Sequence, residues 1–447
     1  TIQYRVFFLM MNKNFHLILI SGLLISACLQ KFSIPEDLEN ESELEFSAGD
    51  TTYLQLSPVW GDDYGIGDPT EISIAQDGRI FIADSAAHSI LVLDQDGGQP
   101  DGFFALRNLE DRNGMAISPI DMDVDQKMNV FFIDGSQRVF IWNQYWNTAG
   151  IAQVSSTGSF RHIQTGALQD ETAGTESWLS LLNNDEWELM NTTFTSDQSV
   201  IDSLINPYLF YDGSMEKNQY LDPYYKPDSS QFTGITSPAG QGNMIFVSDS
   251  YGGTNNQFRL VQVNFQRSRL LELQTGELVW AFTGVFGATI KGYGTGAGTV
   301  NEPLSIEVDY QGNLYYTQAG DYFPVHMIIP NLSGDFAVYS SGFQPGASDI
   351  MNASLYGSAL DVAVDENKNV YVVDGADSDV IVFDANGKYF KEAGYESNSN
   401  IEESIMNQPA AVTVDKRGVV YVCDRGDGAV YRFKLSNSLD EDLKPDD

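Results

Sequence analysis

The sequence predicts an all-β fold: a six-bladed β-propeller of four-stranded antiparallel blades, with a partly helical insertion. Three observations predict it. A short unit of alternating apolar residues recurs six times, each copy holds a tight turn between two apolar runs, and a further apolar run follows most copies. A hairpin unit of this size cannot bury its own faces, so the copies must stack on one another. Four antiparallel strands repeated in this way are typical of a propeller.

Each copy of the unit predicts a strand, a turn and a returning strand. In the first copy Ile72 and Ile74 alternate with polar residues, Asp77-Gly78 supplies the turn, and residues 80–82 form the second strand. All copies end in Asp except the fourth, which ends in Gln. The copies run over Pro69–Asp84, Pro119–Asp134, Gly234–Asp249, Pro303–Gln318, Ala359–Asp374 and Pro409–Asp424.

A third strand follows the copies, as in Ser89–Asp94 and Val380–Asp384. A closed ring also needs the two chain ends to meet, because a propeller leaves no long free edge. Residues Thr51–Leu56 alternate as a strand should. We therefore expect them to complete the last blade beside Val430–Leu435.

The units resemble NHL repeats. Residues 69–93, 359–383 and 409–433 follow that pattern, and Gly292–Gly298 is similar to the glycine-rich connector that precedes many such units. The resemblance covers most of residues 51–436. It implies a six-bladed propeller of NHL type.

The N-terminal residues predict export and lipidation. The short charged segment Met11–Lys13 precedes an apolar stretch, which is typical of a secretory signal over residues 1–27. Leu24–Cys28 resembles the bacterial lipobox, which implies acyl chains on Cys28 and stable membrane attachment. No Asp follows Cys28, so nothing resembles an inner-membrane retention signal. We expect a bacterial cell-envelope lipoprotein of the outer membrane; the alternative is an ordinary signal with an incidental cysteine.

Composition divides the rest of the chain and limits its partners. Residues 28–50 predict an acidic tether, 51–436 the propeller with an insertion at about 165–232, and 437–447 an acidic tail. With 24 Lys and Arg against 62 Asp and Glu, the net charge is −38, which excludes nucleic-acid binding by counterion release. An acidic surface attracts cations or basic ligands, or serves solubility. We expect a monomer without a disulfide, in which Cys423 is a core residue.

The recurring Asp residues have two interpretations. They could converge on a cation or on ligand hydroxyls at the channel mouth. The interpretation that we favour is structural, with each Asp accepting hydrogen bonds from backbone N–H groups of a turn, because a fold residue repeats whereas a catalytic residue is usually single. These residues are Asp84, Asp134, Asp249, Asp374 and Asp424.

Histidines and carboxylates are the side chains that could support enzyme chemistry here. His88 lies where NHL units often carry His, which favours a packing role for it. His162 and His326 do not complete a zinc-ligand spacing of the kind that the amidating lyases use. A lactonase-like hydrolase would need carboxylate and Asn ligands for a divalent metal. No motif selects such a set, although Asn206, Asn301, Glu302 and Asp361 are available. We predict no catalytic residue, metal or cofactor.

Individual features point instead to binding. Residues 176–190 have the apolar spacing of a short helix, and the insertion is rich in aromatic side chains that could stack on a sugar or a partner chain. Self-packing of a long loop, or a degenerate seventh blade, are the alternatives. The candidate ligand-binding residues are Trp178, Trp187, Tyr208, Tyr211, Tyr220, Tyr224, Tyr225 and Gln318. The sequence favours a lipid-anchored scaffold for an unknown protein or carbohydrate ligand, with the lactonase-like hydrolase as the alternative.

Overall fold

The computed structural model divides the chain into residues 1–51 and 52–447, and the described residues belong to the second unit. They are residues 52–101, 105–111, 114–143, 159–161, 167–170, 174–177, 209–213, 230–238, 244–252, 258–272, 278–331, 338–395 and 404–436. The signal segment, Cys28, the tether and the acidic tail lie outside them. No helix in the described ranges has the length and apolarity to span a membrane.

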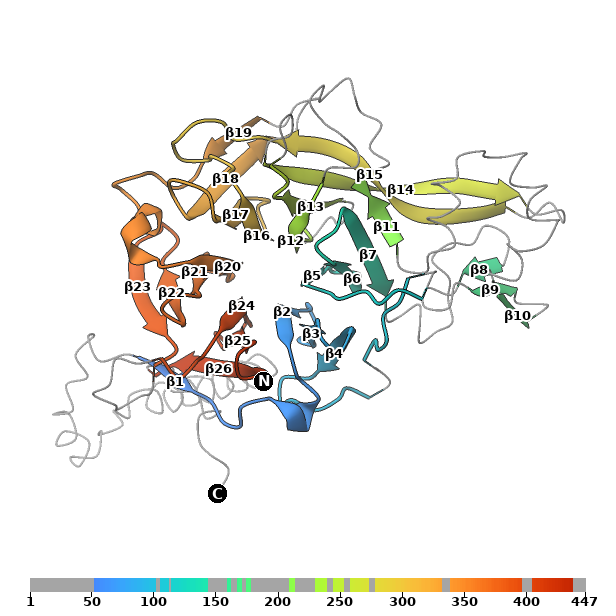
Figure 1. Ribbon diagram of the computed structural model, residues 1–447, viewed down its shortest axis with the longest axis horizontal. Coiled ribbons are helices and arrows are strands. Elements are labelled where there is room, and N and C mark those ends of the chain that lie inside the picture. The colour runs from blue at the N-terminus through green and yellow to red at the C-terminus, as the bar shows by residue number, and fades with distance from the viewer. Residues whose placement is uncertain are drawn as a thin grey trace, which may run out of the picture. The chain divides into compact units, whose positions relative to one another are not determined.

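Six antiparallel sheets stand around a central axis as the blades of a propeller, which confirms the predicted fold class (Figure 1). Blade 1 consists of β2 (Pro69–Ile74), β3 (Ile80–Asp84) and β4 (Ser89–Leu93). Blade 2 consists of β5 (Asp121–Val124), β6 (Asn129–Ile133), β7 (Arg138–Asn143) and β11 (Leu209–Asp212). Blade 3 consists of β12 (Phe232–Thr236), β13 (Met244–Asp249), β14 (Arg259–Glu272) and β15 (Leu278–Ile290). Blade 4 consists of β16 (Pro303–Val308), β17 (Leu314–Gln318), β18 (Val325–Asn331) and β19 (Val338–Ser341). Blade 5 consists of β20 (Ala359–Val364), β21 (Val370–Asp374), β22 (Asp379–Phe383) and β23 (Tyr389–Ala393). Blade 6 consists of β24 (Pro409–Val414), β25 (Val420–Asp424), β26 (Ala429–Leu435) and β1 (Tyr53–Gln55). Short 3₁₀ turns cover Asp62–Tyr64, Asp349–Met351 and Ala353–Leu355.

The first strand of each repeated unit lies innermost, and the following strands lie progressively outward (Figure 1). The predicted hairpins have the expected register, as where Ile72 pairs with Ile82 in blade 1. Blade 1 has three strands, and a single bridge between Ile90 and Leu106 takes the place of a fourth.

The ring closes as predicted. Strand β1 pairs with β26, placing Tyr53 opposite Leu435, and the Leu56 N–H donates to the Arg432 carbonyl at 2.8 Å. Beyond β1, the buried Trp60 exchanges backbone hydrogen bonds with Val430, and the Arg432 guanidinium lies 4.4 Å from the centre of its ring. The last blade is thus built from both ends of the described chain.

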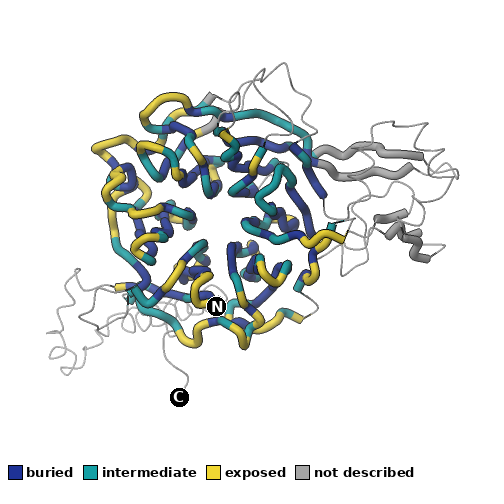
Figure 2. The backbone as a smooth tube through the Cα atoms, viewed as in Figure 1, coloured by how far each residue is buried: buried dark blue, intermediate teal, exposed yellow. Residues whose placement is uncertain are grey.

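The hydrophobic core lies between neighbouring blades, where the apolar strand faces meet (Figure 2). The second strands of the units are buried along their whole length, as in β3 and β25, except that Met244 at the start of β13 is half-buried. Their β-branched and aromatic residues fit a surface packed on both faces. Cys423 in β25 is a buried free cysteine, as predicted.

The structure differs from the sequence-based expectation in the insertion. Strand β11 falls inside the expected range of about 165–232, but it is the outermost strand of blade 2. In the sequence, the insertion therefore falls between the third strand of blade 2, β7, and its fourth strand, β11. Strands β8 (Ser159–Arg161), β9 (Ala167–Asp170) and β10 (Gly174–Ser177) form a separate three-stranded sheet. The start of the expected helix over 176–190 belongs to β10, and the rest lies outside the described residues.

Candidate functional site

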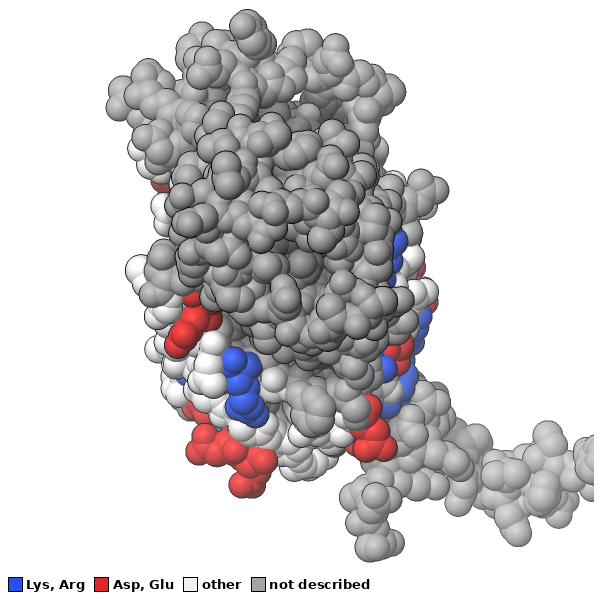
Figure 3. All heavy atoms as spheres, turned by 90° about the vertical axis from the view of Figure 1, so that its right-hand side faces the viewer, with Lys and Arg blue, Asp and Glu red and all other residues white. Residues whose placement is uncertain are grey.

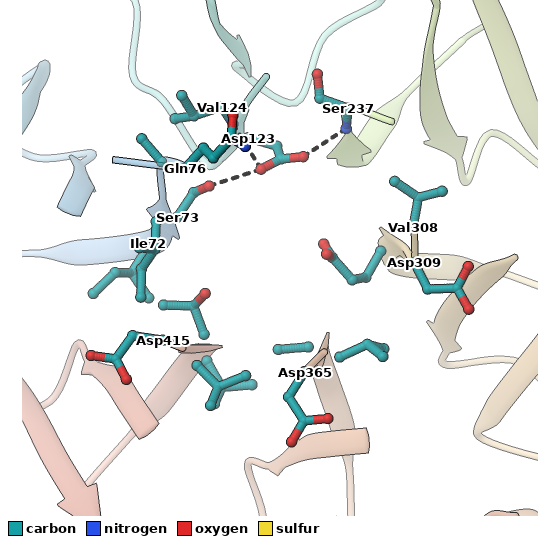
Figure 4. Close-up of a pocket in the computed structure, with 18 of the residues that line it drawn as sticks. Ile72, Ser73, Gln76, Asp123, Val124, Ser237, Val308, Asp309, Asp365 and Asp415 are labelled. Carbon is teal, nitrogen blue, oxygen red and sulfur yellow. Dashed lines mark hydrogen bonds between the residues drawn. The ribbon is translucent and has the colours of Figure 1, made fainter. Parts of the chain in front are cut away.

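A cavity of about 440 Å³ lies on the propeller axis. The innermost strands β2, β5, β16, β20 and β24 form its wall, together with Ile235 of β12 and the neighbouring Ser237 (Figures 1 and 4). The turns that follow these strands, with exposed residues such as Gln76 and Glu366, form its rim. The arrangement follows from the alternation of each innermost strand, whose successive side chains point to opposite faces.

Carboxylates are concentrated in this cavity. They come from the third or fifth position of the repeated unit, where β2 carries Glu71, β5 carries two Asp residues, β16 a Glu and β20 an Asp. The five residues are Glu71, Asp121, Asp123, Glu307 and Asp361. In the sequence these positions are polar members of an alternating strand, and only Asp361 is named as a possible metal ligand. Which face of the strand lies toward the axis becomes known only when the ring is closed.

Asp123 joins three blades. Its Oδ1 accepts from Ser73 Oγ at 2.8 Å and from the Val124 N–H at 2.7 Å (Figure 4). Its Oδ2 accepts from the Ser237 N–H at 2.6 Å and from Thr236 Oγ1 at 3.3 Å. Burial raises the pKa of Asp123 to about 6, although these donors act against the rise. Both oxygens are therefore engaged by the protein itself.

Asp361 has a similar connecting role on the other side of the ring. It accepts a hydrogen bond from Ser305 Oγ in blade 4, and its Oδ2 accepts from the Val412 N–H in blade 6 at 2.7 Å. Burial raises the pKa of Asp361, and these donors lower it. Asp123 and Asp361 thus connect innermost strands to one another.

The other three carboxylates have fewer donors from neighbouring blades. Asp121 accepts from the Ile235 N–H and from the Met122 N–H of its own strand, and Glu307 accepts from the Thr236 hydroxyl. Glu71 Oε1 accepts from the Ile72 N–H at 2.9 Å. Burial is the largest cause that raises the pKa values of Glu71, Asp121 and Glu307 well above their usual range, and the neighbouring carboxylates raise them further. None of the three has an ion-pair partner among the described residues.

The rim of the cavity differs from its wall in having ion pairs. On the side shown in Figure 3, the described surface carries Lys and Arg interspersed with Asp and Glu. At the rim of the cavity, the Lys416 amine lies 3.9 Å from Glu366, which also accepts from the Tyr310 hydroxyl at 3.2 Å. Ion pairs thus neutralise part of the negative charge at the rim, whereas no described Lys or Arg forms an ion pair with the five carboxylates of the wall.

The recurring Asp residues have the structural role that we favoured. Asp84 accepts from the backbone N–H groups of Gly67, Asp68 and Ala87. Asp374 and Asp424 make equivalent bonds in their blades. Asp134 and Asp249 also accept backbone N–H groups, and each pairs with an Arg. Each Asp fastens the turn beside it, and none of the five lines the cavity.

Gln318 occupies the same structural position in blade 4. Its Oε1 accepts from the Asn301 N–H at 3.0 Å, and its Nε2 donates to the Phe323 carbonyl at 2.9 Å. The buried His326 lies beside it, with 3.0 Å between the two Nε2 atoms. Gly298 N–H donates to His326 Nδ1, so the ring proton is on Nε2, 2.9 Å from the Phe323 carbonyl. Burial lowers the pKa of His326 to about 4.

The remaining predicted residues lie apart from the cavity or outside the described residues. Tyr211 is 2 % exposed in β11, with its ring stacked on Phe232 at 6.3 Å. His88 is half-buried, and its Nδ1 lies 2.9 Å from Ser118 Oγ. The candidates and the histidine outside the described residues are Cys28, Trp178, Trp187, Tyr208, Tyr220, Tyr224, Tyr225 and His162. Their predicted roles stay predictions.

The lactonase-like metal set is not assembled within the described residues. Asp361 lines the cavity, whereas Asn301 and Glu302 lie in the loop before β16 and do not line it; Asn206 lies outside the described residues. In the described part of the chain, no three His, Cys, Asp or Glu side chains converge to hold a metal ion. The described donors therefore do not fit such a metal, and no metal-dependent step follows from them.

Comparison with known proteins finds only solved structures that are similar to this chain at low sequence identity. No family model and no curated protein matches the chain. A Bacteroides thetaiotaomicron protein of unknown function is 11 % identical with a TM-score of 0.47, the match covering 87 % of this chain and 77 % of that one. An auxiliary nutrient binding protein from the same organism is 10 % identical with a TM-score of 0.44, with the same coverage. A Xanthomonas campestris gluconolactonase is 10 % identical with a TM-score of 0.42, over 87 % and 90 % of the two chains. Similarity at this level carries no argument about the channel chemistry.

Proposed function

We propose that this chain is a binding protein that takes a small ligand in the central channel of its propeller. The observation that supports this is the axial cavity of about 440 Å³, whose wall carries carboxylates without an ion-pair partner among the described residues. Small-molecule sites are cavities of this size with a few well-placed polar groups on apolar walls.

The sequence supports a lipid-anchored form of this protein at the bacterial outer membrane. The lipobox-like segment before Cys28 and the NHL-like units are its basis. In this proposal the aromatic residues of the insertion provide a second surface for a protein or carbohydrate partner. Radiolabelled palmitate should be incorporated into the wild-type chain in a bacterial host and not into Cys28→Ser. Equal incorporation into both would remove the anchor from the proposal.

A variant that fills the channel tests the binding site. Ala363 lines the cavity and is buried, so Ala363→Met occupies ligand space without removing a carboxylate. A thermal-shift screen of polar small molecules on the detergent-solubilised full chain should find compounds that raise the melting temperature of the wild type. These shifts should be lost in Ala363→Met and kept in Ala86→Met, which changes an exposed turn residue.

A second channel-filling variant and one negative result complete the test. If Ala363→Met does not fold, Thr413→Leu blocks the same cavity from β24. If every stabilising compound acts equally on the wild type and on a folded, channel-filled variant, the channel is not the binding site.

The lactonase-like hydrolase is the alternative function, and the position of Asp361 in the cavity wall is the observation in its favour. Lactone hydrolysis by the purified protein, abolished by a chelator and restored by a divalent ion, would establish it. Absence of hydrolysis with and without added divalent ions would leave the binding function.

A further inference from the structure

We infer that the channel ligand is a small organic cation, an aliphatic compound with an ammonium or guanidinium group that Glu71, Asp121 and Glu307 bind. This inference rests on the proposed function, because it assigns a ligand class to the same cavity. It comes from comparing how the protein treats its carboxylates at the rim and in the wall.

At the rim, the protein supplies cations of its own. Asp309 lies 3.6 Å from the Lys368 amine, and the Asp415 carboxylate lies 2.9 Å from the Arg417 guanidinium. In the wall, no described Lys or Arg reaches Glu71, Asp121 or Glu307. The wall therefore lacks the positive charge that the rim has, and a cationic ligand would provide it.

Glu71 is the most direct sign of a missing donor. It is 9 % exposed and lines the cavity, and its one hydrogen bond among the described residues joins Oε1 to the Ile72 N–H. Its second oxygen, Oε2, receives no donor from these residues. Oε2 is not among the fully enclosed polar atoms without a partner, so it is open to the cavity, where a ligand N–H group would donate to it.

The geometry favours an organic cation over a bare metal ion. A divalent ion such as Ca²⁺ needs several oxygens at about 2.3–2.6 Å, and no three carboxylates converge in this way within the described residues. Asp123 and Asp361 are engaged by donors from neighbouring blades. The remaining carboxylates stand on three different blades around a cavity of about 440 Å³. Asp121 and Glu307 each have one donor from blade 3, and Glu71 has none from another blade in the described part of the chain.

The wall between the carboxylates carries small side chains. The carboxylate face of the innermost strands also presents Ser73, Ser305, Ala363 and Thr413, whereas the alternating residues Ile72, Met122, Ile306 and Val362 are 2–3 % exposed and pack in the core between blades. The small side chains leave room between the charged groups for a narrow aliphatic stem. Burial, and after it the repulsion between neighbouring carboxylates, raises the pKa values of Glu71 and Glu307, and a bound cation relieves the repulsion.

Titration calorimetry of the full chain at pH 7.5 tests the ligand class with agmatine, which carries an ammonium and a guanidinium group on an aliphatic stem. Agmatine should bind with a stoichiometry of one, whereas 1,5-pentanediol and CaCl₂ should not. Glu71→Gln and Glu307→Gln should each weaken agmatine binding by about tenfold, the loss expected for one charge-assisted hydrogen bond. Glu302→Gln, an exposed residue in the loop before β16 that does not line the cavity, is the matched control and should change the affinity less than about twofold.

Competing results overturn this inference in distinguishable ways. Calcium binding without agmatine binding, or agmatine binding that Glu71→Gln and Glu307→Gln leave unchanged, rejects the organic cation. If neutral compounds bind and Ala363→Met abolishes their binding while agmatine fails, the ligand class is wrong and the channel site stands. If no compound responds to channel filling, the proposed function falls together with its ligand class.

Discussion

Ser73 Oγ donates a 2.8 Å hydrogen bond to Asp123 Oδ1 and so joins the innermost strands of blades 1 and 2. The other oxygen of the same carboxylate accepts from the Ser237 N–H in blade 3. One side chain thus holds three blades in register around the axis. The wall of the cavity is therefore also part of the framework that keeps the ring intact.

Removing this carboxylate should destabilise the propeller. Asp123→Ala leaves the Ser73 hydroxyl and two backbone N–H groups without their acceptor, which should lower the free energy of unfolding by about 2–4 kcal/mol. Denaturant unfolding measures the change. Asp77→Ala at the rim, where an exposed ion pair with Arg79 is lost, should cost less than about 1 kcal/mol. Equal losses in the two variants would contradict the connecting role of Asp123.

Stability should rise as the pH is lowered from about 7 toward 5. The folded-state pKa values of the wall carboxylates lie above the ordinary values of 3.8 for Asp and 4.5 for Glu, and that of Asp123 is about 6. A raised carboxyl pKa contributes stability below the ordinary pKa, and this contribution is lost as the pH rises through the folded value. Outside the wall, Asp379 acts in the same direction, with a pKa raised to about 7.

His326 opposes this trend, because its pKa of about 4 means that acid favours the unfolded chain between about 4 and 6.5. Several carboxylates outweigh this one histidine. Thermal unfolding from pH 5 to 8 measures the sum. The triple variant Glu71→Gln, Asp121→Asn, Glu307→Gln should lose much of the increase on acidification; an identical pH profile would show that these groups do not titrate as the geometry indicates.

Gln318 should control the protonation of His326. In Gln318→Glu, a carboxylate replaces the neutral amide beside the imidazole, so the pKa of His326 should rise from about 4 by 1 unit or more. Titration of the histidine ring by NMR measures the shift. Gln318→Met, which is similar in size and uncharged, should leave the pKa low. A rise in both variants would indicate general loosening of blade 4.

Ring closure depends on Trp60. Its side chain is fully buried under the Arg432 guanidinium, and Trp60→Ala removes this contact and leaves a cavity beside Tyr421. The expected loss is about 3–5 kcal/mol in the free energy of unfolding. Val59→Ala, a change at the neighbouring exposed residue, is the control and should have little effect. A small loss for Trp60→Ala would show that closure relies on β1 alone.

Local signals explain which parts of the fold could be predicted. The turn at Asp77-Gly78 and the alternation around Ile72 are contained in one short segment, so each hairpin could be predicted from its own residues. Strand β11 could not, because its partner β7 ends at Asn143, far earlier in the chain, and no local pattern marks that pairing.

The cavity illustrates the same limit for function. Sequence reasoning chose Asp84 and its equivalents because they recur, and correctly favoured a structural role for them. Glu71 and Glu307 could not be predicted as site residues in this way, because Glu71 is the third residue of its copy of the unit and Glu307 is the fifth residue of another copy. Their proximity arises only from closing six blades around an axis, so the signal that could have found them was an acidic residue at a polar position of the first strand.

The pairing of Tyr53 with Leu435 also sets an order on biosynthesis. During synthesis β1 is made before every other strand of the propeller, and it waits without its partner until β26 has been made. Until then the edge of β1 is open, and the wall of the channel is incomplete until β24 has been made. A chain truncated before β26 can therefore form individual hairpins but not a closed ring, so ligand binding would report that synthesis has passed β26.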